Sequence, residues 1–526
     1  MNERLETMLA DLRRIDALPL ADRNRCARRT SWLAEATLPE QVEFFMALLG
    51  QAVPLEANAD LLLKIALGHL VRAQRRAAST SPPALDSSDS RLAASFALYR
   101  HLGPPSQARG QLLALLAVDG REAEVRALVE LLVDDPPALE TDVVQALSPL
   151  FQNPELTVLA VFPRLLAALS NPLLAAAVLD LANFMKRRDL AAAHPAQSRV
   201  ASLISMLGEL SGRLAHLEDH PAAADASALE LSQSIAHSIA LAVALCDALA
   251  LIGDPAAIGK LYQMLERKHR RVRTEAAAAL ARLGEERGKK ELLALAAEPV
   301  ARLRVLAYAA EMRLTAEIDA QFQTPQAKAE AELTVWLAEP TQYGLPPSRC
   351  ELFDQRRQFW PGFVGLVNCY LFRFSYSVTI DEQERVFSNV GVAGPLAHAF
   401  TADLADLPPD DIYAAFAGWQ AAHEDIREYE VASLSRSEQL EVTRLERKLH
   451  DAGYENIQPQ QMGYFFGEKA LVALVEREQT AGVAVADFLE ILFFPARGRR
   501  PLGGREAYCI YKGRKLLRTF NLRSPA

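Results

Sequence analysis

Apolar residues recur at three- and four-residue spacing almost without interruption from Asn2 to about Leu314. This spacing places them on one face of a helix, and the abundant Ala, Leu, Arg and Glu of the region favour helices. Prolines divide the pattern into short pieces, because proline starts or ends a helix. The pattern therefore predicts many short helices joined by tight turns. Two stretches, 78–90 and 216–227, are rich in Ser, Pro, Asp, Ala or His and predict mobile loops.

The helical pattern also repeats itself. The clearest unit, Ile252–Gly284, reads IGDPAAIGKLYQMLERKHRRVRTEAAAALARLG and has apolar residues on two successive helical faces. A second copy covers Leu292–Leu314, and weaker copies precede the first unit. A period of about 30 to 40 residues is typical of helical solenoids.

The segments GDPAAIGKL and VRTEAAAALARLG resemble the HEAT repeat, in a subtype also found in phycobilisome chromophore lyases and in many bacterial HEAT proteins. The resemblance implies that Asp254 and Pro255 start the first helix and that Val272 and Arg273 open the second. It implies a protein-binding solenoid, with a chromophore-lyase-like, enzyme-assisting role as an alternative. The turn 268–271 departs from the pattern, because it is basic where acidic or small residues are usual.

The composition changes near residue 321. Two stretches, 323–328 and 339–347, contain Pro325, Pro340, Gly344 and the pair Pro346-Pro347, as in a linker or a domain edge. We therefore expect a HEAT-like helical-repeat domain over 1–320, a linker over 321–345 and a second domain over 346–526.

The second domain begins with a pattern typical of strands. Asn368–Val378 alternates aromatic and polar residues, and Arg385–Val392 is its expected partner. A hairpin is expected from Ala507–Tyr511 and Lys515–Phe520, which flank a glycine-containing connection. Helices are expected between these pairs, over Pro395–Leu404, Pro409–Ile426, Ser435–Ala452 and Lys469–Glu476. The chain is thus predicted to be mainly α: an α-solenoid followed by a small α+β domain with a three- or four-stranded antiparallel sheet.

Charge limits the classes of partner. The chain has 57 Lys and Arg against 66 Asp and Glu, a net charge of −9, which disfavours a whole-chain nucleic-acid binder. Two local patches are basic: the turn at 267–273 and the stretch Ala496–Arg523. The turn is a candidate site for an anionic partner, with a solvated turn as the alternative. The C-terminal stretch is a candidate site for an acidic protein face or for an acidic surface of its own solenoid, and nucleic acid is a less favoured partner. The candidate residues are Arg267, Lys268, Arg270, Arg271, Arg273, Arg497, Arg499, Arg500, Arg514 and Lys515.

Cations also lie beside aromatic residues where the second domain begins. Arg356, Arg357 and Trp360 are of the residue types that dominate protein recognition sites. Packing in the core or between the domains is the default interpretation, and protein recognition is the alternative.

Catalytic and metal-binding motifs are weak. Cys369, His398 and Asp403 are the nearest approach to a nucleophilic set, but each fits a core or helix-face position equally well. The glycines of 388–395 match no phosphate-binding loop, and the stretch at His423 lacks the second histidine of a zinc motif. No cofactor and no metal site are expected.

The N-terminus has no apolar core of a signal peptide, and the five cysteines show no CxxC spacing. The most apolar run, Ser238–Gly253, is short for a membrane span and contains Asp247. We therefore expect a cytoplasmic protein with no membrane span, acting as a non-enzymatic scaffold or adaptor that binds another protein.

Overall fold

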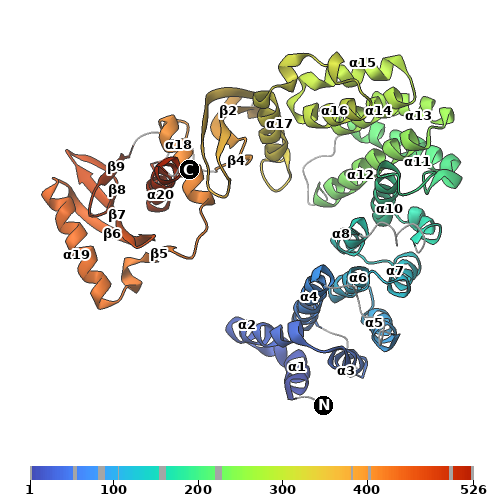
Figure 1. The fold of residues 1–526 in the computed structure, drawn as a ribbon, viewed down its shortest axis with the longest axis horizontal. Coiled ribbons are helices and arrows are strands. Elements are labelled where there is room, and N and C mark those ends of the chain that lie inside the picture. The colour runs from blue at the N-terminus through green and yellow to red at the C-terminus, as the bar shows by residue number, and fades with distance from the viewer. Residues whose placement is uncertain are drawn as a thin grey trace. The chain divides into compact units, whose positions relative to one another are not determined.

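A computed structural model describes residues 3–50, 56–80, 89–104, 106–152, 161–219, 228–380, 383–400, 404–496 and 501–522. The chain divides into two compact units, Met1–Leu292 and Leu293–Ala526 (Figure 1). Within the described residues the first unit is entirely helical, and both β-sheets belong to the second.

The first unit is a succession of helices, coloured blue to green in Figure 1. Their bounds are α1 Glu3–Arg14, α2 Leu20–Arg29, α3 Leu38–Leu49, α4 Ala57–Thr80, α5 Asp89–Leu102, α6 Ala108–Asp119, α7 Glu122–Asp134, α8 Glu140–Leu147, α10 Pro172–Arg187, α11 Val200–Asp219, α12 Ala228–Ile252, α13 Ile258–Leu265 and α14 Arg270–Arg282. Helix α15, Glu286–Ala294, contains the boundary between the units.

These helices stack in two adjacent rows. Helix α4 packs on α6, α6 on α8, α8 on α10, α10 on α12, and α12 on α14. A second row lies beside the first, in which α3 packs on α5 and α11 on α13. Each helix therefore buries its apolar stripe against neighbours close in the chain, which is the defining property of a solenoid. The predicted helical solenoid is confirmed for this unit.

Helix α12 is the most apolar element. By length and composition its 19 residues Ser234–Ile252 could cross a membrane, with a mean hydropathy of 2.2, and 50% of that window is buried inside the structure. Core helices of soluble proteins meet the same test. Asp247 in this window forms an ion pair with Arg187 of α10.

The second unit combines helices with two antiparallel sheets. It contains α16 Pro299–Glu311, α17 Pro325–Ala338, α18 Pro409–Gln420, α19 Arg436–Asp451 and α20 Gly504–Leu522. The first sheet has the order β1-β2-β3-β4, from Arg349–Phe359, Leu366–Ile380, Gln383–Ala393 and His398–Ala399. The second has the order β5-β6-β7-β8-β9, from Ile426–Glu430, Glu455–Phe465, Glu468–Arg477, Thr480–Ala486 and Ile491–Pro495.

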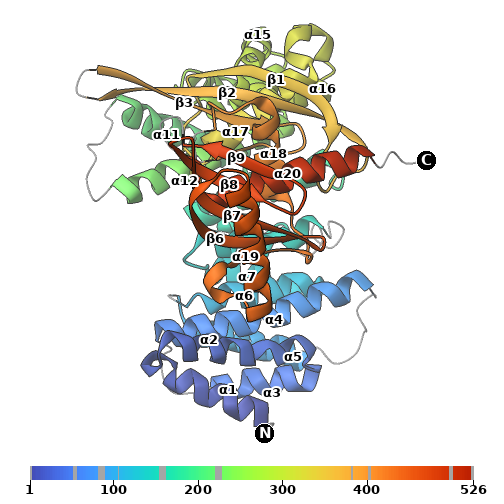
Figure 2. The ribbon, with the colours of Figure 1, turned by 90° about the vertical axis from the view of Figure 1, so that its left-hand side faces the viewer.

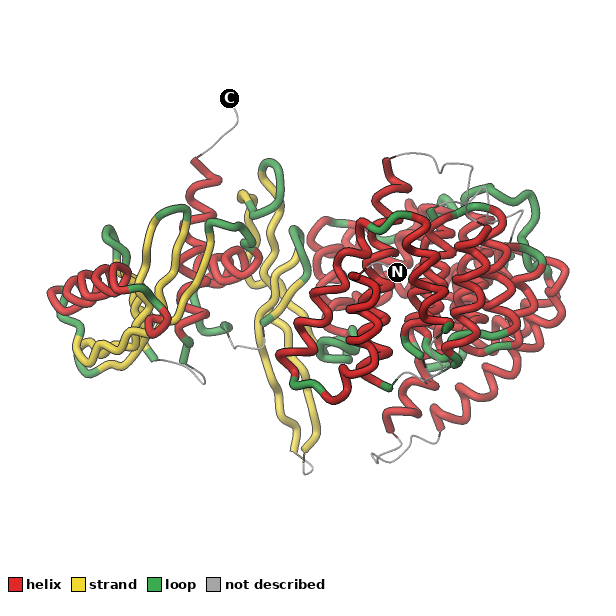
Figure 3. The backbone as a smooth tube through the Cα atoms, turned by 90° about the horizontal axis from the view of Figure 1, so that it is seen from below, coloured by secondary structure: helices red, strands yellow, loops and turns green. Residues whose placement is uncertain are grey.

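Helices and sheets alternate in layers within this unit. Figure 3 shows the two sheets in yellow with red helices between them. Tyr370, Phe372 and Phe374 of β2 pack against α17, whereas the alternate residues Cys369 and Leu371 face a core shared with α18 and α20. The second sheet covers the other side of these two helices and carries α19 on its outer face. Successive residues of a strand point to opposite faces, so one aromatic strand serves two cores.

The sequence predicted the first strand pair correctly. Strands β2 and β3 pair antiparallel in a long ribbon, with Tyr370 opposite Ala393 and Ser377 opposite Val386 (Figure 2). Helix α19 also lies where a helix was expected.

Several expectations differ from the structure. The expected hairpin over 507–520 is part of helix α20, and the expected helix over 469–476 is strand β7. Within the stretch 395–404, where a helix was expected, the structure has the short strand β4 at His398–Ala399, and residues 401–403 lie outside the described residues. Helix α18 ends at Gln420 instead of Ile426. The unit has two sheets where one was expected.

The domain edges differ as well. The expected linker over 321–345 contains α17, which packs on the first sheet, and the structure divides the chain near residue 292 instead of 320. Of the two expected loops, 78–80 ends α4, 89–90 begins α5 and 216–219 ends α11. The remaining loop residues, 81–88 and 220–227, lie outside the described residues.

Candidate protein-interaction surfaces

The basic turn, residues 267–273, connects α13 to α14. Glu218 of α11 lies against it: one carboxylate oxygen accepts hydrogen bonds from the backbone N–H of Lys268 at 2.6 Å and of His269 at 3.3 Å, and the other lies 3.6 Å from the Arg267 guanidinium. Arg273 lies 3.8 Å from the Glu291 carboxylate. Two of the cations in the turn are therefore used to hold the repeat together.

The other candidate cations of the turn, Lys268, Arg270 and Arg271, have exposed side chains. Lys268 and Arg271 form no side-chain ion pair with the residues that the structure describes. These three residues form a positive surface at the turn between α13 and α14. This surface is smaller than the number of cations in the sequence indicated, because Arg267 and Arg273 are paired with carboxylates.

The basic residues of the C-terminal helix have partners inside their own unit. Arg514 donates from Nε to Asp411 Oδ1 at 2.7 Å, and Lys515 Nζ lies 2.6 Å from Asp487 Oδ2 and also pairs with Glu468. These contacts fix α20 to α18 and to the second sheet. The other candidates of this patch, Arg497, Arg499 and Arg500, lie outside the described residues.

The cation and aromatic group near the start of the first sheet is also largely internal. Arg356 bridges Asp354 at 2.9 Å and Asp410 at 2.6 Å, and its guanidinium lies 4.5 Å from the centre of the Tyr413 ring. Trp360 is fully buried and donates its indole N–H to Gln420. Arg357 has an exposed side chain.

The structure describes two of the three residues of the weak nucleophilic set, Cys369 and His398, and each has packing contacts of its own. Burial raises the pKa of the Cys369 thiol to about 11, so the reactive thiolate is disfavoured. The His398 ring stacks on Trp419 with ring centres 4.0 Å apart, and burial lowers its pKa. Asp403 lies outside the described residues. Among the described residues, no group of three His, Cys, Asp or Glu side chains is placed to hold a metal ion.

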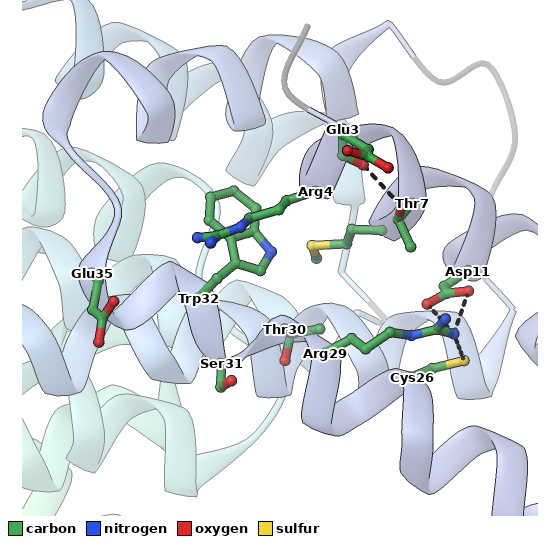
Figure 4. Close-up of a pocket in the computed structure, with 11 residues that line it drawn as sticks. Glu3, Arg4, Thr7, Asp11, Cys26, Arg29, Thr30, Ser31, Trp32 and Glu35 are labelled. Atoms are coloured by element: carbon green, nitrogen blue, oxygen red, sulfur yellow. Dashed lines mark hydrogen bonds and ion pairs between the residues drawn. The ribbon is translucent and has the colours of Figure 1, made fainter.

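A further cavity lies at the N-terminus of the first unit, with a volume of about 470 Å³ (Figure 4). The carboxylate of Asp11, which is 1% exposed, forms ion pairs with Arg29 and with Arg14. Arg29 also donates to the Cys26 sulfur at 3.2 Å (Figure 4). These polar groups interact with one another, and the ion pair between Asp11 and Arg29 links α1 to α2.

A groove in the first unit has a different character. It lies among the short helix Arg164–Ser170, α10, α11 and α12, and consists of two adjoining cavities of about 440 Å³ and 250 Å³. Leu169, Leu210 and Leu241 contribute to its apolar lining, and Met206 of α11 opens onto it. Two exposed arginines, Arg199 and Arg213, stand at its rim.

The sequence contained a signal for this groove that the helical pattern obscured. Ser202, Met206, Glu209 and Arg213 are spaced by three or four residues and therefore follow one stripe of α11, and Arg199 precedes this stripe by three residues at the end of the short helix Gln197–Arg199. An apolar residue between cations on an exposed stripe is a mark of a recognition surface. The stripe could not be placed without knowing which side of α11 is covered by α12 and α13.

Comparison with known families agrees with this architecture. Residues 229–312, from α12 to α16, match HEAT repeats. No curated protein and no solved structure matches the chain significantly. The chain therefore contains HEAT repeats, as the sequence predicted, and the match does not single out the chromophore-lyase subtype.

Proposed function

We propose, from the HEAT repeats at 229–312, that this chain is a cytoplasmic, non-enzymatic scaffold or adaptor whose helical-repeat surface binds another protein. The repeats are the observation that carries the proposal. Stacked helix pairs expose a long surface relative to their mass, and such surfaces commonly bind proteins. The second unit is proposed to contribute to the same function as a basic C-terminal module.

The charges of the solenoid support a partner with an acidic face. The exposed cations of the basic turn lie at the start of α14, inside the matched repeats. Opposite charges on two surfaces speed association and exclude partners of the wrong sign. The internal pairing of Arg514 and Lys515 makes the C-terminal helix a weaker candidate for the same role.

The test is affinity purification of the tagged full-length chain from the cells that produce it, followed by quantification of co-purifying proteins. We expect a stoichiometric protein partner. Reversing the exposed charges of the turn, with Lys268→Glu and Arg271→Glu, is expected to weaken its binding by about tenfold or more.

The matched control is Arg75→Glu with Arg447→Glu, because both arginines are exposed and lie outside the candidate surfaces. This control should retain the partner. Purification of the chain without any stoichiometric protein, or equal loss in both double variants, would contradict the proposal.

A further inference from the structure

We propose that the groove among residues 164–170, α10, α11 and α12, defined above, binds an acidic amphipathic helix of the partner protein. The inference rests on the proposed scaffold function and assigns the binding site and the chemistry of its occupant. The argument depends on the apolar floor, on the charges of the rim and on their spacing.

The floor of the groove offers burial to apolar side chains. Leu169 and Leu210 are buried where they meet the cavity, while Met206 and Leu241 are half-buried at its surface. Methionine adapts its shape to different ligands. A cavity of about 440 Å³ joined to a second one is within the size range of binding clefts.

The rim carries more positive than negative charge. Neither Arg199 nor Arg213 has an ion pair or a side-chain hydrogen bond among the described residues. Glu209 is the acidic residue of the lining, and the Ser205 hydroxyl donates to its carboxylate at 3.3 Å. His237 at the far end is paired with Glu140 at 2.7 Å. Two guanidinium groups thus remain to bind carboxylates of a ligand.

The spacing of the two arginines indicates the form of the ligand. They are 14 residues apart in the chain, since Arg199 ends the short helix Gln197–Arg199 and Arg213 lies in α11, which follows it directly. At about 1.5 Å per residue this corresponds to about 21 Å, or nearly four helical turns. A partner helix lying along α11 would match both with carboxylates about 14 residues apart, and its apolar stripe between them would face Met206. This is the helix-in-groove mode of recognition.

The experiment uses the full-length chain and two fluorescein-labelled peptides of about 18 residues, each with a leucine stripe. One peptide carries Glu at two positions about 14 residues apart, and the other carries Lys at those positions. By fluorescence anisotropy, we expect the Glu peptide to bind the wild-type chain at least ~10-fold more tightly. The variant Arg199→Glu with Arg213→Glu should reverse this preference, while Arg75→Glu with Arg447→Glu should leave it unchanged.

Both groove arginines are exposed, so the variant is expected to keep the unfolding temperature of the wild type, which thermal denaturation measures. Equal binding of the two peptides, or a preference that the charge reversal leaves intact, would overturn the inference. So would binding of phosphatidylserine vesicles lost in the same variant, because the occupant would then be an anionic membrane surface.

The groove proposal and the scaffold proposal can be refuted independently of each other. Peptides that do not bind, together with a partner that the groove variant still captures, would refute the groove and leave the scaffold function standing. A chain that captures no partner would refute the scaffold function whatever the peptides do.

Discussion

At the scale of single residues, His194 shows how a buried polar group holds two repeats together. Its Nδ1 accepts a hydrogen bond from the Ala196 N–H at 3.1 Å, so Nε2 carries the proton and donates to Asn183 Oδ1 at 2.9 Å. Asn183 in turn donates to the Ala244 carbonyl of α12 at 3.1 Å. Protonation of Nδ1 would break the first of these bonds. Burial, helped by the charge of Lys186, lowers the pKa of His194 from 6.5 to about 4.

This shift predicts a dependence of stability on pH. The unfolded chain takes up a proton at His194 near pH 6.5 and the folded chain near pH 4, so folding is favoured above this window and weakened as the pH falls through it. We expect His194 to cost the first unit about 3 kcal/mol between pH 7 and pH 4. Urea denaturation measures the free energy of unfolding at each pH.

The variant His194→Gln is the control, because glutamine can donate a hydrogen bond and does not titrate. Its unfolding free energy should fall less than that of the wild type over the same pH range. Parallel losses in the two proteins would show that His194 is not the group responsible.

At the scale of elements, the crossing of α18 and α20 depends on two glycines. A Cβ atom on Gly513 would collide with the carbonyl oxygen of Ala414, and one on Gly418 would collide with that of Cys509. We expect Gly513→Ala to lower the free energy of unfolding by about 2 kcal/mol or more, because backbone atoms cannot move aside without separating the helices. Denaturant unfolding of the full-length chain measures the change.

Gly212 of α11 provides the matched control, because a Cβ atom at this helical glycine would meet no atom within 4 Å. Gly212→Ala should stabilise the chain by about 0.5–1 kcal/mol, since alanine loses less entropy in a helix. Destabilisation of equal size in both variants would refute the role assigned to the crossing.

At the scale of the whole molecule, charge determines which macromolecules can bind. The net charge is −9, and three cations of α20, Lys512, Arg514 and Lys515, are paired with Glu428, Asp411 and Asp487. We expect no anisotropy change of a labelled single-stranded RNA at physiological salt up to about 10 µM protein, because the net charge repels phosphates and carboxylates already neutralise these three cations of α20. A salt-sensitive association abolished by Arg497→Glu, Arg499→Glu and Arg500→Glu would instead support a nucleic-acid function of the tail.

The errors in the sequence-based predictions have specific physical causes. Strand β7 lies between two other strands and is buried on both faces, so Ala470, Leu471, Val472 and Ala473 form a continuous apolar run without alternation. Such a run cannot be distinguished from a helix by its period. Gly513 was interpreted as a hairpin turn, whereas it permits a close helix crossing that depends on a segment about a hundred residues earlier in the chain.

The candidate site was predictable only in part. The positive charge of the basic turn is a property of consecutive residues and could be counted. Glu218 pairs with Arg267 and accepts hydrogen bonds from the backbone of the turn because α11 packs beside α13. No local sequence pattern reveals this packing.

The sequence by itself determined the helical period, its repetition every 30 to 40 residues and the aromatic alternation of β2, because these arise from the spacing of side chains along one segment. Only the tertiary structure decided the order of the strands in the two sheets, the ion pair between Lys515 and Asp487, and the groove beside α11. Each of these depends on which distant segments meet, and many distant pairings are compatible with the same local pattern. The proposed partner-binding surface consists of side chains that those contacts leave exposed.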